Sequence, residues 1–410
     1  MEKLLSVEEA RKRILENFKP NKSKKIELEN CLHQFLSNDI SARIDLPSFD
    51  NSSMDGFAVK VEDLFGLSKE NPIELVIIED IAAGYSPKKE IQKGQAARIM
   101  TGAPLPRGAD TIVPVELTNF SDRYAQETLP EKIIIQKNVN KGDNIRPKGQ
   151  DIQQGDLIFH KGHKLRPQDL GFLAAQGFDK VDVVQKPKVA LLSSGDELLK
   201  PGEELVPGKI YDSNSITIKN MLESFGAEVI DLGVAKDNYH DVKYKLDSVI
   251  NLDVDLIVST AGVSVGVYDY IREVILNEGS LNFWKVNIRP GKPLTFGEYR
   301  NIPFLGLPGN PVSDYVSTLI FIKPIINKML GNLETFNLNQ AILLEEISSD
   351  GRESYLRAEV EKIDGEYFAR LSSHQGSGNI FSLVCANALL IIPAGVKCVP
   401  KGKAVNFYWI

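Results

Sequence analysis

The chain has 410 residues, of which 42% are hydrophobic and 25% charged, and its formal net charge is −7. Because single domains usually hold roughly 100–200 residues, this length predicts several domains. The negative charge and the lack of a dominant basic block exclude general nucleic-acid binding. The apolar runs are also shorter than the roughly 18 residues that a membrane-spanning helix needs.

The N-terminus and the cysteines indicate the compartment. The opening run MEKLLSVEEARKRIL contains acidic residues and too short an apolar segment for a secretory signal. Cys31, Cys385 and Cys398 have the spacing of neither a disulfide framework nor a zinc site. We therefore expect a cytoplasmic protein.

Residues 1–45 are predicted to be helical. Ser6 and Glu9 have the spacing of a capping box, and an apolar face continues beyond them. A second helix is predicted from Pro167 to about Gly177 and is expected to pack against the first.

Short β-like runs separated by Gly, Pro and Asn fill residues 46–146. We therefore predict a β-rich domain inserted into a discontinuous helical linker domain, which would comprise residues 1–45 and 147–182.

Strand-like and helix-like segments alternate from residue 183 to residue 331. This alternation predicts a parallel, three-layer α/β domain, in which ligands bind beyond the carboxyl ends of the strands. Its last helix should start at Asn310, with Pro311 as its first residue, and should be kinked by Pro324.

Residues 332–410 return to β-like runs and contain the hairpin signal Asp364-Gly365. A small barrel or sandwich fits this pattern, and we expect a C-terminal β-barrel domain.

Four polar segments follow predicted strands of the α/β domain: residues 193–197, Asp237, residues 259–269 and residues 308–311. Small residues let backbone N–H groups approach an oxyanion, and the helices that follow would add favourable N-termini. Each segment alone is also an ordinary turn, but four on one edge favour a binding site.

The run WKVNIRPGKP holds three cations, Lys285, Arg289 and Lys292, around a Pro-Gly turn. Such a cluster suits a phosphate, although an exposed hairpin tip would have a similar composition. The five histidines show no convincing metal-ligand spacing. A metal in this protein should therefore bind to carboxylates, as Mg²⁺ does.

The chain resembles the MoeA family of molybdopterin molybdenumtransferases, and the related domains of gephyrin, in seven segments that occur in the same order. They are NSSMDGFAV, ARIMTGAPLPRGADTIVPVE, GDNIRPKGQDI, LLSSGDEL, STAGVSVGVYDY, FWKVNIRPGKPLTFG and GLPGNPVS.

This resemblance implies an enzyme that inserts molybdate into adenylylated molybdopterin with Mg²⁺. The phosphoanhydride is cleaved and AMP is released, giving molybdenum cofactor. The resemblance also implies a homodimer whose active site is shared between the subunits, and possible partners among molybdopterin adenylyltransferases and molybdoenzymes.

The resemblance also assigns residues to roles. The candidate catalytic residues are Asp55, Thr101, Asp151, Glu197, Asp237 and Asp269, of which Glu197, Asp237 and Asp269 would bind Mg²⁺. Asp55, Thr101 and Asp151 would come from the partner subunit. The candidate substrate-binding residues are Ser193, Ser194, Gly195, Ser213, Asn214, Gly262, Ser264, Gly266, Lys285, Arg289, Lys292, Pro308, Asn310, Pro311, Arg357 and Ser377.

The sequence departs from the family pattern at a few positions. Ala261 stands where the family usually has Gly, and Gln150 stands where Glu is common. If position 261 required a positive φ, alanine would cost roughly 1 kcal/mol.

Two other functions remain open from the sequence. They are a molybdopterin adenylyltransferase and a non-catalytic scaffold like gephyrin.

Overall fold

The computed structural model describes residues 4–120, 129–261, 270–332 and 338–410. The chain folds into two compact units. One unit holds Met1–Asn38, Lys161–Leu170 and Asp179–Ile410, and the other holds Asp39–His160 and Gly171–Phe178. Within the described ranges, every helix is too short or too polar to cross a membrane. The four-domain division is finer than these two units and stays a prediction.

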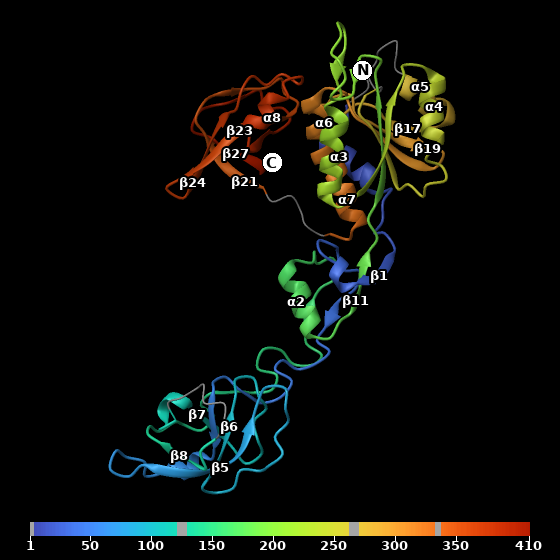
Figure 1. The fold of residues 1–410 in the computed structure, drawn as a ribbon. Coiled ribbons are helices and arrows are strands. Elements are labelled where there is room, and N and C mark those ends of the chain that lie inside the picture. Colours follow the sequence, from blue (N-terminus) through green and yellow to red (C-terminus); the bar gives the residue numbers. More distant parts are fainter. Residues whose placement is uncertain (1–3, 121–128, 262–269, 333–337) are drawn as a thin grey trace. The chain divides into compact units, whose positions relative to one another are not determined.

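A six-stranded sheet forms the centre of the first unit (Figure 1). In sheet order its strands are β15 (Glu228–Ala235), β12 (Lys188–Ser194), β16 (Leu256–Ser259), β20 (Ile302–Gly306), β19 (Thr295–Tyr299) and β17 (Gly279–Phe283). The first four are parallel, as predicted. The prediction of a purely parallel sheet is wrong at one strand: β19 runs antiparallel to both of its neighbours, β20 and β17. The reason is a two-residue turn at Arg300 and Asn301, both with positive φ, that sends β20 straight back along β19.

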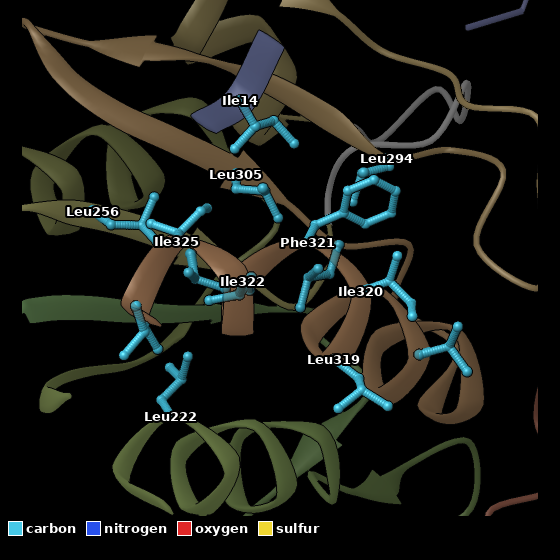
Figure 2. Packing of buried hydrophobic residues seen from close by; sticks show 14 of the residues in the cluster. Ile14, Leu222, Leu256, Leu294, Leu305, Leu319, Ile320, Phe321, Ile322 and Ile325 are labelled. Atoms are coloured by element: carbon cyan, nitrogen blue, oxygen red, sulfur yellow. The ribbon is translucent and has the colours of Figure 1, made fainter. Parts of the chain in front are cut away.

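Helices cover both faces of this sheet, as expected for a three-layer α/β fold. The helices are α3 (Asn214–Phe225), α4 (Tyr239–Asp247), α5 (Tyr270–Glu278), α6 (Pro311–Ser317) and α7 (Lys323–Met329). Along β12, Val189 and Leu191 pack with α3, α6 and α7, whereas Ala190 and Leu192 pack with α4 and α5. Burial on both faces explains why β12 is apolar at consecutive positions. Figure 2 shows the first of these two cores, where Leu222 of α3 lies near Ile322 and Ile325.

The helix after β20 contains a wide turn before Pro324. Between α6 and α7 the chain forms the π-helical turn η4 (Thr318–Ile322), and the N–H of Lys323 donates to the carbonyl of Thr318, five residues back. A proline in a regular helix clashes with the carbonyl four residues earlier, and the π turn gives it room. At the place where a kink was predicted, the helix therefore widens into a π-helical turn.

The N-terminal segment is less helical than predicted. Helix α1 (Val7–Leu15) begins at Ser6, whose hydroxyl accepts the N–H of Glu9. After α1 the prediction of helix is wrong, because β1 (Ser23–Glu27) pairs antiparallel with β11 (Lys180–Val184). Helix α1 packs against α7 and the sheet core. The second predicted helix is α2 (Pro167–Ala175). The segment after α2 is thus joined to the N-terminal segment by the pairing of β11 with β1.

The C-terminal part of the first unit is a closed barrel, as predicted. Its five strands are β23 (Glu353–Ile363), β24 (Glu366–Leu371), β21 (Asn339–Leu343), β27 (Ala404–Trp409) and β25 (Ala388–Ile392), and β25 pairs with β23 to close the ring. Asp364 and Gly365 form the tight turn between β23 and β24, and both have a positive φ. A short strand, β18 (Ile288–Arg289), adds to β23 and so joins the barrel to the α/β part.

The second unit is built on a five-stranded sheet. In sheet order its strands are β7 (Thr111–Pro114), β4 (Gly56–Val59), β6 (Gln95–Ile99), β5 (Ile73–Ile81) and β8 (Lys132–Ile135). Two shorter pairings complete it, β3 (Asn51–Ser52) with β9 (Ile145–Arg146) and β2 (Ile40–Ser41) with β10 (Leu157–Phe159). The β-rich character predicted for residues 46–146 is confirmed.

Candidate functional site

The loops at the carboxyl ends of the four parallel strands are joined to one another. Between the loops after β12 and β15, the N–H of Asp196 donates to Asp237 Oδ2 at 3.1 Å, and the N–H of Asp237 donates to Asp196 Oδ1 at 3.2 Å. Between β12 and β16, the hydroxyls of Ser193 and Thr260 lie 2.8 Å apart. The predicted strand-end segments therefore form one continuous rim.

The Pro308–Pro311 turn adjoins this rim on the far side of β16. The N–H of Leu307 donates to the carbonyl of Ser259 at 2.8 Å. The side-chain amide of Asn214, in the first turn of α3, donates to the carbonyl of Gly309 at 2.7 Å. Ser213 is the N-cap residue of α3. The two substrate-binding candidates of α3 thus adjoin the predicted turn.

The cations of the WKVNIRPGKP run lie on one short excursion of the chain. The N–H of Val286 donates to the carbonyl of Lys292 at 3.0 Å, which brings the two ends of the run together. Lys285 Nζ lies 3.5 Å from the centroid of the Trp284 ring, and the guanidinium of Arg272 lies 4.9 Å from the same centroid. Stacking on an aromatic ring holds a cation in place while leaving it charged.

Arg357 is a fully buried cation, and no carboxylate among the described residues forms an ion pair with it. Its Nε donates to Ser382 Oγ at 2.9 Å, and its Nη2 donates to the carbonyls of Gly376 and His374 at 3.0 and 3.3 Å. Its Nη1 is buried and finds no hydrogen-bond partner within the described ranges. Burial, and to a smaller extent the nearby charge of Arg289, lower the pKa of Arg357 to about 10. Arg357 is therefore still charged at neutral pH.

A buried, uncompensated charge is costly unless an opposite charge arrives. Arg357 therefore indicates a place for an anion at the junction between the barrel and the α/β part. The same junction includes Ser377, whose carbonyl accepts the N–H of Val312 at 3.0 Å. The barrel thus reaches the Pro308–Pro311 turn through a direct hydrogen bond.

The other three catalytic candidates all lie on the second unit, where two of them are in contact. Asp55 Oδ1 accepts the N–H of Thr101 at 2.8 Å and its hydroxyl at 2.7 Å. Asp151 pairs with Arg146 at 2.7 Å, and Arg146 is the strand partner of Asn51, four residues before Asp55. Asp55, Thr101 and Asp151 are all exposed. Asp55 and Thr101 are thus in direct contact, and Asp151 lies on the same unit, paired with Arg146.

Gly56 explains why the Asp-Gly pair cannot be an ordinary turn. A Cβ atom at Gly56 would lie 2.2 Å from the carbonyl oxygen of Val113 on β7. Any larger residue would push β4 away from β7 and move Asp55, which stands next to it. The glycine is thus required by the close approach of two strands.

The carboxylates of the first unit suit Mg²⁺ only in part. Among the described residues there is no group of three His, Cys, Asp or Glu side chains that could hold a metal. Glu197 and Asp237 border the same rim, and a Cβ at Gly195 would lie 2.6 Å from Glu197 Oε2. Mg²⁺ commonly uses one or two protein carboxylates together with phosphate oxygens and waters. The donors fit an Mg²⁺ ion that arrives with a phosphate-bearing substrate.

Four predicted residues, Gly262, Ser264, Gly266 and Asp269, lie outside the described residues. Ala261, just before them, is not one of the described non-glycine residues with a positive φ, so the alanine carries no backbone strain of that kind. Ser194 and Gly195 are buried at the end of β12, and Asn310 is exposed at the start of α6.

Sequence reasoning missed Asp314, which is buried beside the Pro308–Pro311 turn and accepts the N–H of Gly309 at 2.8 Å. An acidic residue in the first turn of a helix is usually a solvent-exposed one, so the sequence carried no signal of its burial. Reasoning also missed the contact of Arg272 with Trp284, which joins residues on different elements.

Comparison with known proteins identifies the whole chain. Residues 5–177 match the MoeA N-terminal region (domain I and II), residues 190–328 match a "probable molybdopterin binding domain", and residues 340–410 match the MoeA C-terminal region (domain IV). A molybdopterin molybdenumtransferase of Nostoc sp. is 35% identical, over 91% of this chain and 85% of the relative. One of Bacillus subtilis is 34% identical, over 98% and 93%.

A crystal structure of a molybdopterin biosynthesis MoeA protein from Pyrococcus horikoshii covers 99% of both chains, with a TM-score of 0.83 and 32% identity. Its likeness extends to the entire length described above, including the barrel and the β-rich unit. The chain therefore belongs to the MoeA family of molybdopterin molybdenumtransferases.

Proposed function

We propose that this protein inserts molybdate into adenylylated molybdopterin, with cleavage of the phosphoanhydride and release of AMP. The relatives support molybdenum transfer, since they are named for it. The observation that carries the proposal is Arg357, a buried guanidinium with an unpaired Nη1 close to the charge of Arg289. Substrate phosphates and molybdate are anions that such a pair of cations binds.

The residues of the rim have separate tasks in this proposal. Arg289 and Arg357 offset the negative charge that develops as the anhydride breaks and AMP leaves. Ser193 and Ser194 stand at the end of β12, where small side chains permit close approach of a ligand. Glu197 and Asp237 would hold Mg²⁺, which supplies charge neutralisation at the phosphate oxygens when it is bound.

We also propose that the active site is completed by a second copy of the chain. Asp55, Thr101 and Asp151 lie on a different unit from the rim, and family resemblance assigns them to the partner subunit. Acidic groups next to an anionic substrate need a cation between them, so the same Mg²⁺ requirement follows for them.

The test is incubation of the protein with adenylylated molybdopterin, molybdate and Mg²⁺, followed by measurement of AMP. We expect AMP release that depends on molybdate, stops when EDTA removes Mg²⁺, and returns when Mg²⁺ is restored in excess. Because Asp237 is a proposed ligand, Asp237→Asn should raise the Mg²⁺ concentration needed for half-maximal activity by about tenfold. Exposed Asp231, on the strand β15 that precedes Asp237, provides the control Asp231→Asn.

Other results would point to the alternatives. Consumption of ATP with plain molybdopterin would indicate an adenylyltransferase. Binding of molybdopterin without any turnover would indicate a scaffold. Full activity in EDTA would contradict the role of the carboxylates as Mg²⁺ ligands.

A further inference from the structure

Asp314 is a charged residue type in an unusual position. It lies in the first turn of α6, yet none of its surface is exposed. An acidic side chain at a helix start normally stays in solvent, where it favours the positive end of the helix dipole. A carboxyl group that is removed from water needs hydrogen-bond donors that compensate for the loss.

The donors of Asp314 come from the candidate substrate pocket. Oδ1 accepts the N–H of Gly309 at 2.8 Å, and Oδ2 accepts the side-chain amide of Asn214 at 3.1 Å. The same amide nitrogen of Asn214 donates to the carbonyl of Gly309 at 2.7 Å. Asp314, Asn214 and Gly309 thus form a closed ring of hydrogen bonds, here called the bracket, in which both the N–H and the carbonyl of Gly309 take part.

The bracket fixes two parts of the rim at once. Gly309 has a φ of 91°, a backbone conformation that glycine adopts more readily than other residues. It also lies close to Ala261: a Cβ atom added at Gly309 would be 3.4 Å from the Cβ of Ala261. Asn214 belongs to α3, whereas the turn joins β20 to α6. Without the carboxyl group, the turn and the start of α3 would lose their common anchor.

We propose that Asp314 is a positioning residue of the substrate pocket, which sets the place of the Pro308–Pro311 turn and of the Asn214 amide from inside the protein. The inference rests on the proposed function, because it takes those residues to contact the substrate. Asp314 itself touches no substrate. Its effect reaches the ligand through the two groups that it holds.

The surroundings of Asp314 disfavour its ionised form, and the hydrogen bond from the Gly309 N–H opposes this only in part. Among the described residues no cation pairs with it, and the charged group that faces it is Asp212, which is also buried and lies just before α3. Burial raises the pKa of Asp314 well above its usual range, and the charge of Asp212 raises it further. In its protonated form, Asp314 would add no negative charge beside a phosphate-bearing substrate.

A pH dependence follows from this arrangement. As pH rises through the raised pKa of Asp314, the group ionises and repels both Asp212 and an anionic ligand. Affinity for the substrate should therefore fall over that range. Asp314→Asn is neutral at every pH and should lack this step.

The experiment compares Asp314→Ala and Asp314→Asn with the wild type in KM, kcat and binding of molybdopterin followed by its fluorescence. We expect Asp314→Ala to raise KM for adenylylated molybdopterin by about tenfold with little change in kcat, because a lost positioning contact weakens substrate and transition state alike. Asp314→Asn has one acceptor oxygen where the aspartic acid has two, so its KM should rise less. Thr318→Val is the matched control, since Thr318 Oγ1 is buried in the same helix without a partner in the described residues.

An unchanged KM in both variants, or a pH step that survives in Asp314→Asn, would overturn the inference. So would a loss of kcat alone. Direct binding of molybdopterin keeps the test independent of turnover: a wild type that binds the pterin but releases no AMP contradicts the proposed function, while the affinities of the variants still decide the role of Asp314. If Asp314→Ala does not fold, Asp314→Asn decides the question by its pH profile.

Discussion

Asp55→Ala should reduce molybdate-dependent AMP release by on the order of a thousandfold while leaving a folded protein. Thr101 directs both its N–H and its hydroxyl to Asp55 Oδ1, so the carboxylate is held in one orientation although the residue is exposed. The measurement is the single-turnover rate of AMP formation, together with the thermal unfolding midpoint.

Two variants sharpen the Asp55 result. Asp55→Asn keeps an oxygen that can accept from Thr101 but removes the charge, and it should be nearly as inactive as Asp55→Ala. Thr101→Val keeps the backbone N–H bond and loses only the hydroxyl, so a loss of about tenfold is expected. An active Asp55→Asn would show that charge is not what this position supplies, and normal turnover by Asp55→Ala would remove Asp55 from the site.

Arg357→Met should lower kcat/KM for adenylylated molybdopterin by about a hundredfold. The guanidinium is buried, retains its charge at neutral pH with a pKa of about 10, and leaves Nη1 without a partner among the described residues. Methionine leaves Ser382 Oγ and the carbonyls of His374 and Gly376 without the hydrogen bonds of the guanidinium, so we also expect a modest fall in the unfolding midpoint.

Two further variants distinguish the contribution of the Arg357 charge from that of the placement of its guanidinium. Arg357→Lys keeps a cation but cannot offer the planar fork, and it should recover only part of the activity. Ser382→Ala removes the acceptor of the 2.9 Å bond from Nε and should cause a smaller loss, because the other contacts of the guanidinium remain. A fully active Arg357→Met with a lowered unfolding midpoint would make Arg357 a purely structural residue.

Local sequence signals predicted the parts of the fold that depend on near neighbours. Asp364-Gly365 predicted a two-residue hairpin because few residues accept two consecutive positive φ angles, and the structure has that turn. The polar segments after the apolar runs of β12, β15 and β20 were expected at one sheet edge, where parallel strands end together. Helix was wrongly predicted beyond Leu15, since the strand Ser23–Glu27 depends on a partner more than 150 residues later in the chain.

The site itself depends on contacts that no local pattern encodes. Arg289 and Arg357 are neighbours because β18 pairs with β23, which the spacing of charges along the chain cannot show. The family resemblance placed Arg357 in the site, but its burial and its unpaired Nη1 emerge only from the packing of the barrel. Asp314 had the appearance of an ordinary acidic residue at a helix start, and only the fold places it inside.

The most direct test of the shared active site is AMP release by a mixture of two inactive variants. Asp55→Ala removes the proposed catalytic carboxylate of one unit, and Arg357→Met removes the proposed anion-binding cation of the other. If each site joins the two units of different subunits, equal mixing with subunit exchange leaves about one quarter of all sites intact, and about that share of wild-type AMP release should return. Activity no higher than that of the separate variants, with exchange confirmed by mass spectrometry, would contradict a site shared between subunits.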